Sequence, residues 1–192
     1  MSDLIKNILQ ESCDVKQKVI NDDRLLKIIQ DVTTACIYAL KNGNKLLFAG
    51  NGGSASDSQH IAAELVGRFE KDRNALPALA LTTNSSQLTA ISNDYGYDNV
   101  FQRQVQALAK SGDVFFGLST SGNSKNVVNA VEQCKQLNVI SVAMTGESGG
   151  KLQALSDYCI NVPSGNTARI QEVHITIGHI ICLAIEESIF PS

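Results

Sequence analysis

The sequence predicts an α/β fold, a three-layer sandwich in which helices cover both faces of a five-stranded parallel sheet. From residue 45 onward, short apolar runs alternate with stretches of helical period. The runs are almost unbroken, as is typical of strands that are buried on both faces. No long polar linker interrupts the 192 residues. We therefore expect one domain over 1–192, made of an N-terminal helical hairpin (1–43) and an α/β core (44–192).

An N-terminal helical pair is predicted before the first strand, over 3–20 and about 25–40. Apolar residues recur in both stretches at steps of three and four, and an Asn-Gly-Asn stop signal at 42–44 ends the second helix. We expect both apolar stripes to be buried. Because a helical pair outside a sheet often buries its stripe against another subunit, the pattern favours an oligomer.

The remaining elements alternate as strand and helix. Strands are expected over 46–50, 78–83, 113–119, 139–145 and 157–163. Helices are expected from about 54, over 87–92 and 100–108, from about 124, and over 167–188. Ligands of such sheets bind beyond the carboxyl ends of the strands. We therefore expect Gly50, Thr82, Ser119 and Thr145 to open onto one rim.

The loop after the first strand is rich in glycine. Gly50 to Ala55 satisfies the GxGxxA form of a dinucleotide-binding fingerprint. That fingerprint also needs an acid at the end of the second strand, where this chain has Thr82-Thr83-Asn84. A nicotinamide cofactor is therefore disfavoured. Asn51 and the backbone of Gly52 and Gly53 suit the hydroxyl groups of a small polar ligand better.

The loop after the third strand has the chemistry of a phosphate site. It reads Ser119-Thr120-Ser121-Gly122-Asn123-Ser124, and a helix follows at once. Four hydroxyls, a glycine and a helix N-terminus together favour an anion. The lysine of a nucleotide-triphosphate loop is absent. Helix capping by Ser121 or Ser124 is the alternative, but it explains one hydroxyl rather than four.

Two predicted helices carry polar residues that could meet. His60 and Glu64 are four apart on the first, so they lie on one face and could bind a metal or transfer protons. A solvated pair is the alternative. Gln171 and His179 stand among isoleucines on the last helix, and buried polar groups need partners. His174 points about 140° away from His179, so at most one of the two histidines is expected to join a shared site.

The composition narrows the function classes. A net charge of −3 argues against nucleic acid as the main ligand. The N-terminal residues do not resemble a signal peptide, and no apolar run approaches the roughly 20 residues of a membrane span. The five cysteines lie far apart without a CxxC pair, which predicts packed, reduced thiols. We expect a cytoplasmic protein without membrane partners.

Five motifs carry a family resemblance. They read GNGGSASDSQHIAAEL, SNDYGYDNVF, GLSTSGNSKNV, TGESGGKL and TARIQEVHITIGHIIC. In sequence and spacing they closely resemble the phosphoheptose isomerases, which have the sugar isomerase fold. The resemblance implies a flavodoxin-like sandwich and a homotetramer with active sites between subunits. It implies conversion of D-sedoheptulose 7-phosphate to D-glycero-D-manno-heptose 7-phosphate, the first step towards the heptose of bacterial lipopolysaccharide.

The resemblance also implies site residues. One Zn²⁺ per subunit would be held by the family's four ligand positions, which are His60, Glu64, Gln171 and His179. Substrate contacts would fall on Asn51, Gly52, Gly53, Glu64, Asn93, Asp94, Ser119, Thr120, Ser121, Ser124 and Gln171. Isomerisation through an enediol would use Glu64 as the base at carbon. His179 would move a proton between the two oxygens.

A non-catalytic relative of the same fold provides the competing interpretation. The scaffold that binds the replication initiator DnaA has a similar length and similar loops, and its resemblance extends to the tail at 189–192. Such a scaffold does not need a metal-ligating constellation, which this chain keeps. A sugar-phosphate-sensing transcription regulator would need an added DNA-binding domain. The residues therefore favour the isomerase.

Overall fold

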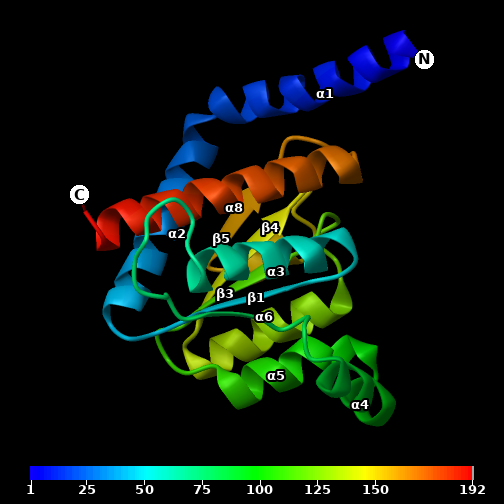
Figure 1. Ribbon diagram of the computed structural model, residues 1–192. Helices are drawn as coiled ribbons and strands as arrows, with labels where there is room; N and C mark the ends of the chain where they lie inside the picture. Colours follow the sequence, from blue (N-terminus) through cyan, green and yellow to red (C-terminus); the bar gives the residue numbers. More distant parts are fainter. Residues whose placement is uncertain (192) are drawn as a thin grey trace.

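The computed structural model describes residues 1–191 as a three-layer α/β sandwich (Figure 1). Five strands form one parallel sheet in the order β2-β1-β3-β4-β5. They are β1 (Leu46–Gly50), β2 (Ala78–Ala80), β3 (Val114–Leu118), β4 (Ile140–Thr145) and β5 (Tyr158–Asn161). The predicted fold class and the five predicted strands are confirmed. The second strand is shorter than the predicted 78–83, because the chain turns away after Ala80.

Helices cover both faces of this sheet. One face carries α1 (Ser2–Ile20), α2 (Asp23–Lys41), α3 (Gly53–Val66) and α8 (Thr167–Ile189). The other carries α4 (Ser85–Tyr95), the 3₁₀ turn η1 (Tyr97–Asn99), α5 (Val100–Leu108), α6 (Lys125–Leu137) and α7 (Leu152–Leu155). Among the α-helices of residues 1–191, only the four-residue α7 lacks a predicted counterpart, because so short a turn has no apolar period of its own.

The strands divide their side chains between two cores. Phe48 and Phe116 stack 4.9 Å apart beneath α3 and α8, whereas Leu47 and Phe115 belong to the core beneath α5 and α6. Successive residues of a strand point to opposite faces. Both faces of this sheet are covered, so the strands are apolar at almost every position.

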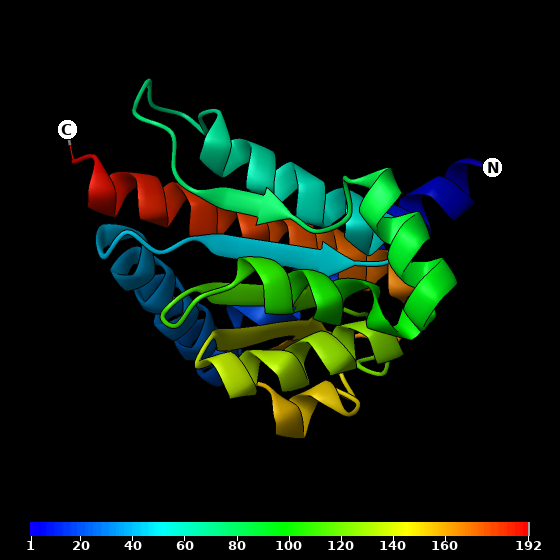
Figure 2. The ribbon, with the colours of Figure 1, turned by 90° about the horizontal axis from the view of Figure 1, so that it is seen from below.

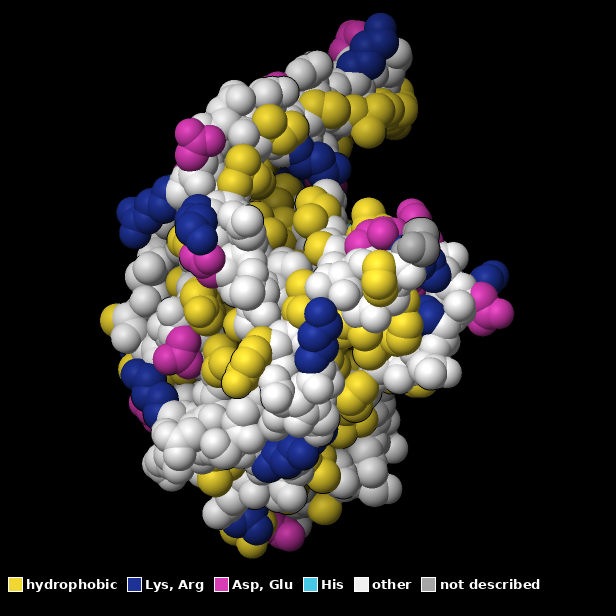
Figure 3. All heavy atoms as spheres, turned by 90° about the vertical axis from the view of Figure 1, so that its left-hand side faces the viewer, with side chains coloured by type: hydrophobic (Ala, Val, Ile, Leu, Met, Phe, Trp, Pro, Cys, Tyr) yellow, Lys and Arg dark blue, Asp and Glu magenta, His cyan; other side chains and the backbone are white. Residues whose placement is uncertain are grey.

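The predicted N-terminal helical pair is confirmed as α1 and α2. Figure 1 shows α1 running away from α2 instead of lying along it. Only Val15 and Val19 of α1 are buried. Within the chain the apolar stripe is left uncovered over the first half of the helix, where four large side chains are 42–61% exposed: Leu4, Ile5, Ile8 and Leu9. Their burial against another subunit stays a prediction. In Figure 3 apolar side chains gather along this projecting arm.

The last helix, α8, is long and apolar enough to cross a membrane, but half of its most apolar stretch is buried within the protein. Val173, Ile177 and Ile181 lie in the core beneath the sheet, as in the core helix of a globular domain. The cysteines are free thiols; four are buried as predicted, and Cys13 is exposed.

Candidate active site

Two loops leave the carboxyl edge of the sheet next to each other. The chain continues from β1 to β2 on one side and from β3 to β4 on the other, so the loops after β1 and β3 flank the topological switch point. Asn51, which follows β1, exchanges amide hydrogen bonds of 3.0 and 2.8 Å with Asn126 of α6. The hydroxyl of Tyr97 donates to the same Asn51 oxygen at 3.0 Å. These bonds connect the loop after β1 to α6 and to the 3₁₀ turn η1.

The loop after β1 leads directly into the N-terminus of α3. Gly52 caps the helix with φ +55°, which favours glycine, and provides no capping side chain. A Cβ on Gly53 would lie 2.6 Å from Nε2 of Gln171. The amide of Gln171 therefore rests on the predicted substrate loop, and the missing Cβ at position 53 makes room for it.

The loop after β3 is built as the sequence predicted. The hydroxyls of Ser119 and Ser124 lie 2.9 Å apart. Ser124 is the N-cap residue of α6, yet its side chain makes no capping hydrogen bond within the described chain, which weighs against capping by Ser124. The hydroxyl of Ser121 accepts the backbone N–H of Asn123 at 3.2 Å. Thr120 and Ser121 line a cavity of about 310 Å³. Gly122 has φ +66°, and a Cβ there would collide with the carbonyl oxygen of Gly149.

Asn93 and Asp94, the remaining predicted substrate residues, lie near the end of α4. Their side chains are exposed and bonded to each other, Nδ2 of Asn93 to Oδ1 of Asp94 at 2.9 Å. Figure 2 shows this helix beside the carboxyl ends of the strands. The contact of Asn93 and Asp94 with substrate stays a prediction.

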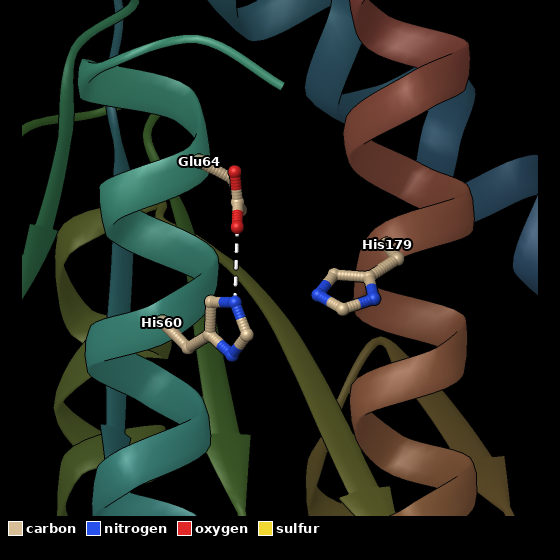
Figure 4. Close-up of side chains that lie close together, drawn as sticks. All are labelled: His60, Glu64 and His179. Carbon is tan, nitrogen blue, oxygen red and sulfur yellow. Dashed lines mark hydrogen bonds and ion pairs between the residues drawn. The ribbon is translucent and has the colours of Figure 1, made fainter. Parts of the chain in front are cut away.

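Three predicted site residues converge farther along α3. Nε2 of His60 lies 2.9 Å from Oε1 of Glu64, and His179 projects towards them from α8 (Figure 4). The two imidazole centroids are 4.9 Å apart and the rings are edge-on. One ligand atom from each of the three residues lies within 4.8 Å of the others. The His–Glu pair is therefore not an isolated, solvated pair.

A glycine on α8 allows this convergence. A Cβ on Gly178 would lie 2.6 Å from Cδ1 of Ile61, so α3 and α8 can approach this closely only without a side chain at that position. Each histidine is adjacent in sequence to one of the two contact residues: His60 precedes Ile61, and His179 follows Gly178. The helix contact thus places the two imidazoles against each other.

The donor set fits zinc. Two imidazoles and one carboxylate are a common ligand set of catalytic zinc sites, which keep a position open for substrate. Nε2 of His179 is buried and has no hydrogen-bond partner among residues 1–191. The side chains of His60 and Glu64 are 51% and 22% exposed, so a ligand can reach the cluster from solvent.

The fourth predicted ligand, Gln171, does not join the three within this chain. It precedes His179 by eight residues, about 12 Å along the helix axis, and its amide lies beside Gly53 instead. This position agrees with its predicted role at the substrate loop. Its role as a metal ligand stays a prediction.

His174 is a core residue. It is fully buried, and its Nε2 lies 3.1 Å from the carbonyl oxygen of Thr145. Burial lowers its pKa from 6.5 to about 4, although the hydrogen bond to Thr145 opposes the shift. Of the two histidines of α8, only His179 faces α3, as the predicted angle between them requires.

Asp57 and Phe69 were not predicted at the site. Asp57 precedes His60 by one helical turn; its Oδ2 is buried without a partner in the described chain, and burial raises the pKa of this carboxyl while His60 opposes the shift. Because Asp57 and His60 are three residues apart on one helix, the sequence alone could have placed them on the same face. The ring of Phe69 lies 5.5 Å from that of His179, and this contact has no local signal.

Comparisons with known proteins show the family of this chain. The SIS domain family model matches residues 12–146. The chain is 56% identical to a phosphoheptose isomerase of Aneurinibacillus thermoaerophilus, covering 99% of this chain and 96% of the relative. It is 54% identical to phosphoheptose isomerase 2 of Campylobacter jejuni, covering 99% and 94%. The chain belongs to the phosphoheptose isomerase family.

Solved structures of this family have the same fold. The phosphoheptose isomerase of Neisseria gonorrhoeae superposes with a TM-score of 0.91 at 42% identity, over 97% of this chain and 98% of that one. The enzyme of Francisella tularensis gives 0.92 at 38% identity, over 96% and 97%. The agreement extends over nearly the whole length of a phosphoheptose isomerase, and these relatives lend no support to the alternative of a DnaA-binding scaffold.

Proposed function

We propose that this protein converts D-sedoheptulose 7-phosphate to D-glycero-D-manno-heptose 7-phosphate. The observation that carries the proposal is the meeting of Glu64 and His179, an acid–base pair from two different helices, in a chain 56% identical to a phosphoheptose isomerase. An aldose–ketose isomerisation needs one group that moves a proton between carbons and one that moves a proton between oxygens. This cluster contains both.

In the proposed reaction Glu64 takes the proton from C1 of the ketose. The resulting enediol passes a proton from O1 to O2 through His179, and the acid form of Glu64 returns its proton to C2. His60, 2.9 Å from Glu64, orients the carboxylate. Loss of a C–H proton and its return to the neighbouring carbon leave the atom count unchanged.

We further propose that His60, Glu64 and His179 hold one zinc ion per subunit, with Gln171 as the fourth predicted ligand. Bound zinc would supply Lewis-acid polarisation of the substrate carbonyl. The unpartnered Nε2 of His179 supports this assignment. Metal analysis of the purified protein tests it: about one zinc per chain is expected, and its loss from a His179→Ala variant.

The phosphate is proposed to bind at the loop after β3. Ser119, Thr120, Ser121 and Ser124 would donate hydrogen bonds to its oxygens, and the N-terminus of α6 would add its dipole. Asn51, Gly52, Gly53 and Gln171 would contact the sugar hydroxyls. Such anchoring places the far end of the sugar and so orients the reacting carbons.

We also propose a cytoplasmic homotetramer that supplies lipopolysaccharide heptose. The exposed apolar residues of α1 support assembly, because a row of 42–61% exposed large side chains is unusual on the surface of a monomer. Light scattering on the purified protein should give the mass of four chains, and Leu9→Asp should lower it. A monomeric wild type would contradict this part of the proposal.

The activity is tested by solvent deuterium exchange into sedoheptulose 7-phosphate, with and without a chelator. Exchange that requires zinc supports the enzyme. No exchange, together with binding to purified DnaA, would support the scaffold. Glu64→Gln should abolish exchange while substrate affinity stays nearly intact, and Glu132→Gln, an exposed carboxylate on α6, serves as the matched control. An active Glu64→Gln enzyme would reject the role of Glu64.

A further inference from the structure

The segment that follows α3 is held by a buried ion pair outside the site described above. The carboxylate of Glu186, on α8, is fully buried and accepts the backbone N–H groups of Phe69 (3.2 Å), Glu70 (2.8 Å) and Lys71 (2.7 Å). Nε of Arg73 donates a fourth hydrogen bond at 2.9 Å. The carboxylate thus gathers four donors from one short segment, which is ordered around it.

Arg73 attaches the same segment to the end of α3. Its guanidinium, 2% exposed, donates from Nη2 to the carbonyl oxygen of Glu64 (2.8 Å) and from Nη1 to that of Leu65 (2.7 Å). Two more carbonyl oxygens, of Gly67 and Asn74, accept from Nη1. Because the last carbonyls of a helix have no intrahelical partners, a buried cation here stabilises the end of α3.

Both ends of this network reach the proposed active site. Arg73 bonds the backbone of Glu64, and the segment places the Phe69 ring 5.5 Å from the ring of His179. Glu186 itself lies two turns after His179 on the same helix. The ion pair therefore joins α3 to α8 next to the residues that face each other across the two helices.

We propose that Glu186 and Arg73 are positioning residues that set the separation of α3 and α8, and so the geometry of the His60–Glu64–His179 cluster. The inference rests on the proposed zinc isomerase function. A buried ion pair that loses one partner leaves an unpaired charge and disturbs its surroundings. Groups that orient metal ligands from outside typically change metal affinity or activity by about 10–100-fold when they are replaced.

The test compares Glu186→Gln with Glu187→Gln. Both replace a glutamate of α8 by its isosteric amide, but Glu187 is 53% exposed and pairs with Lys71 at the surface. Zinc affinity is measured by competition with a chromophoric chelator, and kcat and KM are measured on sedoheptulose 7-phosphate. The folded fraction is checked by circular dichroism, so that a loss of stability alone does not change the result.

We expect Glu186→Gln to weaken zinc binding and lower kcat by at least about tenfold. KM should stay within about twofold, because the phosphate loop is untouched, and Glu187→Gln should stay within about twofold throughout. A folded Glu186→Gln protein that behaves like Glu187→Gln would overturn the proposal.

A second variant decides the outcome if Glu186→Gln does not fold. Arg73→Lys keeps a positive charge beside Glu186 but loses the forked hydrogen bonds to the carbonyl oxygens of Glu64 and Leu65. Reduced zinc affinity or kcat supports the proposal, and unchanged values for both overturn it. A wild-type protein that binds zinc but does not isomerise refutes the proposed function alone, because the zinc measurements still test the positioning. A wild-type protein without zinc affinity refutes both.

Discussion

A methyl group added at Gly178 should force apart the two helices that carry the proposed site. In Gly178→Ala the new Cβ would lie 2.6 Å from Cδ1 and 2.7 Å from Cγ1 of Ile61. Carbon atoms in good contact lie about 3.5–4.0 Å apart, so roughly 1 Å has to be gained. Ile61 is 2% exposed and packed in the core beneath the sheet, and it has little room to move aside.

Two opposing contributions set the change in the free energy of unfolding of Gly178→Ala. Overpacking a core position costs about 1–3 kcal/mol, whereas replacing glycine by alanine inside a helix gains about 1 kcal/mol. We therefore expect Gly178→Ala to destabilise the protein by about 1 kcal/mol net. In an Ile61→Ala background, itself destabilised by about 2–5 kcal/mol, the added methyl group meets a cavity instead of a side chain. There it should stabilise by about 1 kcal/mol, so the two sites should couple by about 2 kcal/mol.

Urea unfolding of the four proteins, followed by circular dichroism at one protein concentration, measures this coupling. The change should appear in the midpoint and leave the m value unaltered. Gly178→Ala should also weaken zinc binding, since His179 moves with α8. If the substitution stabilised both backgrounds by the same amount, as at an ordinary exposed helix position, the close approach of α3 and α8 would not limit the packing.

Three further predictions concern pH and the phosphate loop. The pKa of His174 is about 4 folded and 6.5 unfolded, so the unfolded chain binds the proton first. Stability should then fall by about 3 kcal/mol as pH drops from 6.5 to 4, and pH-dependent urea curves of His174→Gln should be flatter. Asp113 is buried, which raises its pKa, but its bonds to Lys45 and neighbouring donors outweigh burial and lower it. Asp113→Asn should therefore be less stable than wild type at neutral pH, with a difference that disappears as acid titrates this carboxylate in the wild type. Ser124→Ala should raise KM roughly tenfold through a lost hydrogen bond to a charged group. Stability should fall by only about 1 kcal/mol, because no capping bond is lost and only the bond to the Ser119 hydroxyl is removed; an unchanged KM would remove Ser124 from the phosphate site.

Local sequence patterns were sufficient to predict the elements whose structure is determined by their own residues. The strand at 46–50 and the helix at 100–108 were predicted at their observed bounds, because apolar period and flanking turn residues are properties of a short segment. The serine-rich loop was predictable for the same reason. Its hydroxyls, its glycine and the following helix are consecutive in the chain.

Contacts between distant segments needed the folded chain. The helical pair within 1–43 was predictable, but the direction of α1 was not, because it depends on tertiary contacts such as that of Arg169 with the carbonyl oxygen of Ile8, 161 residues away. Gln171 and His179 were grouped from the polar positions of one apolar helix, and the family resemblance added their role as zinc ligands. On α8 the two lie about 12 Å apart along the axis, and only the packing of that helix on α3 separates the amide beside Gly53 from the imidazole beside His60.

By itself the sequence determined the α/β class, through the alternation of strand and helix patterns along the chain. It also determined the glycine-rich and serine-rich loops and the His60–Glu64 pair, because each depends on residues within about one helical turn or one loop. The tertiary structure decided that His179 lies beside that pair and that His174 is an uncharged residue of the core. It also decided that Glu186 and Arg73 join the two helices. These outcomes depend on how closely α3 approaches α8. That distance is set at Gly178 and Ile61, more than a hundred residues apart in the chain.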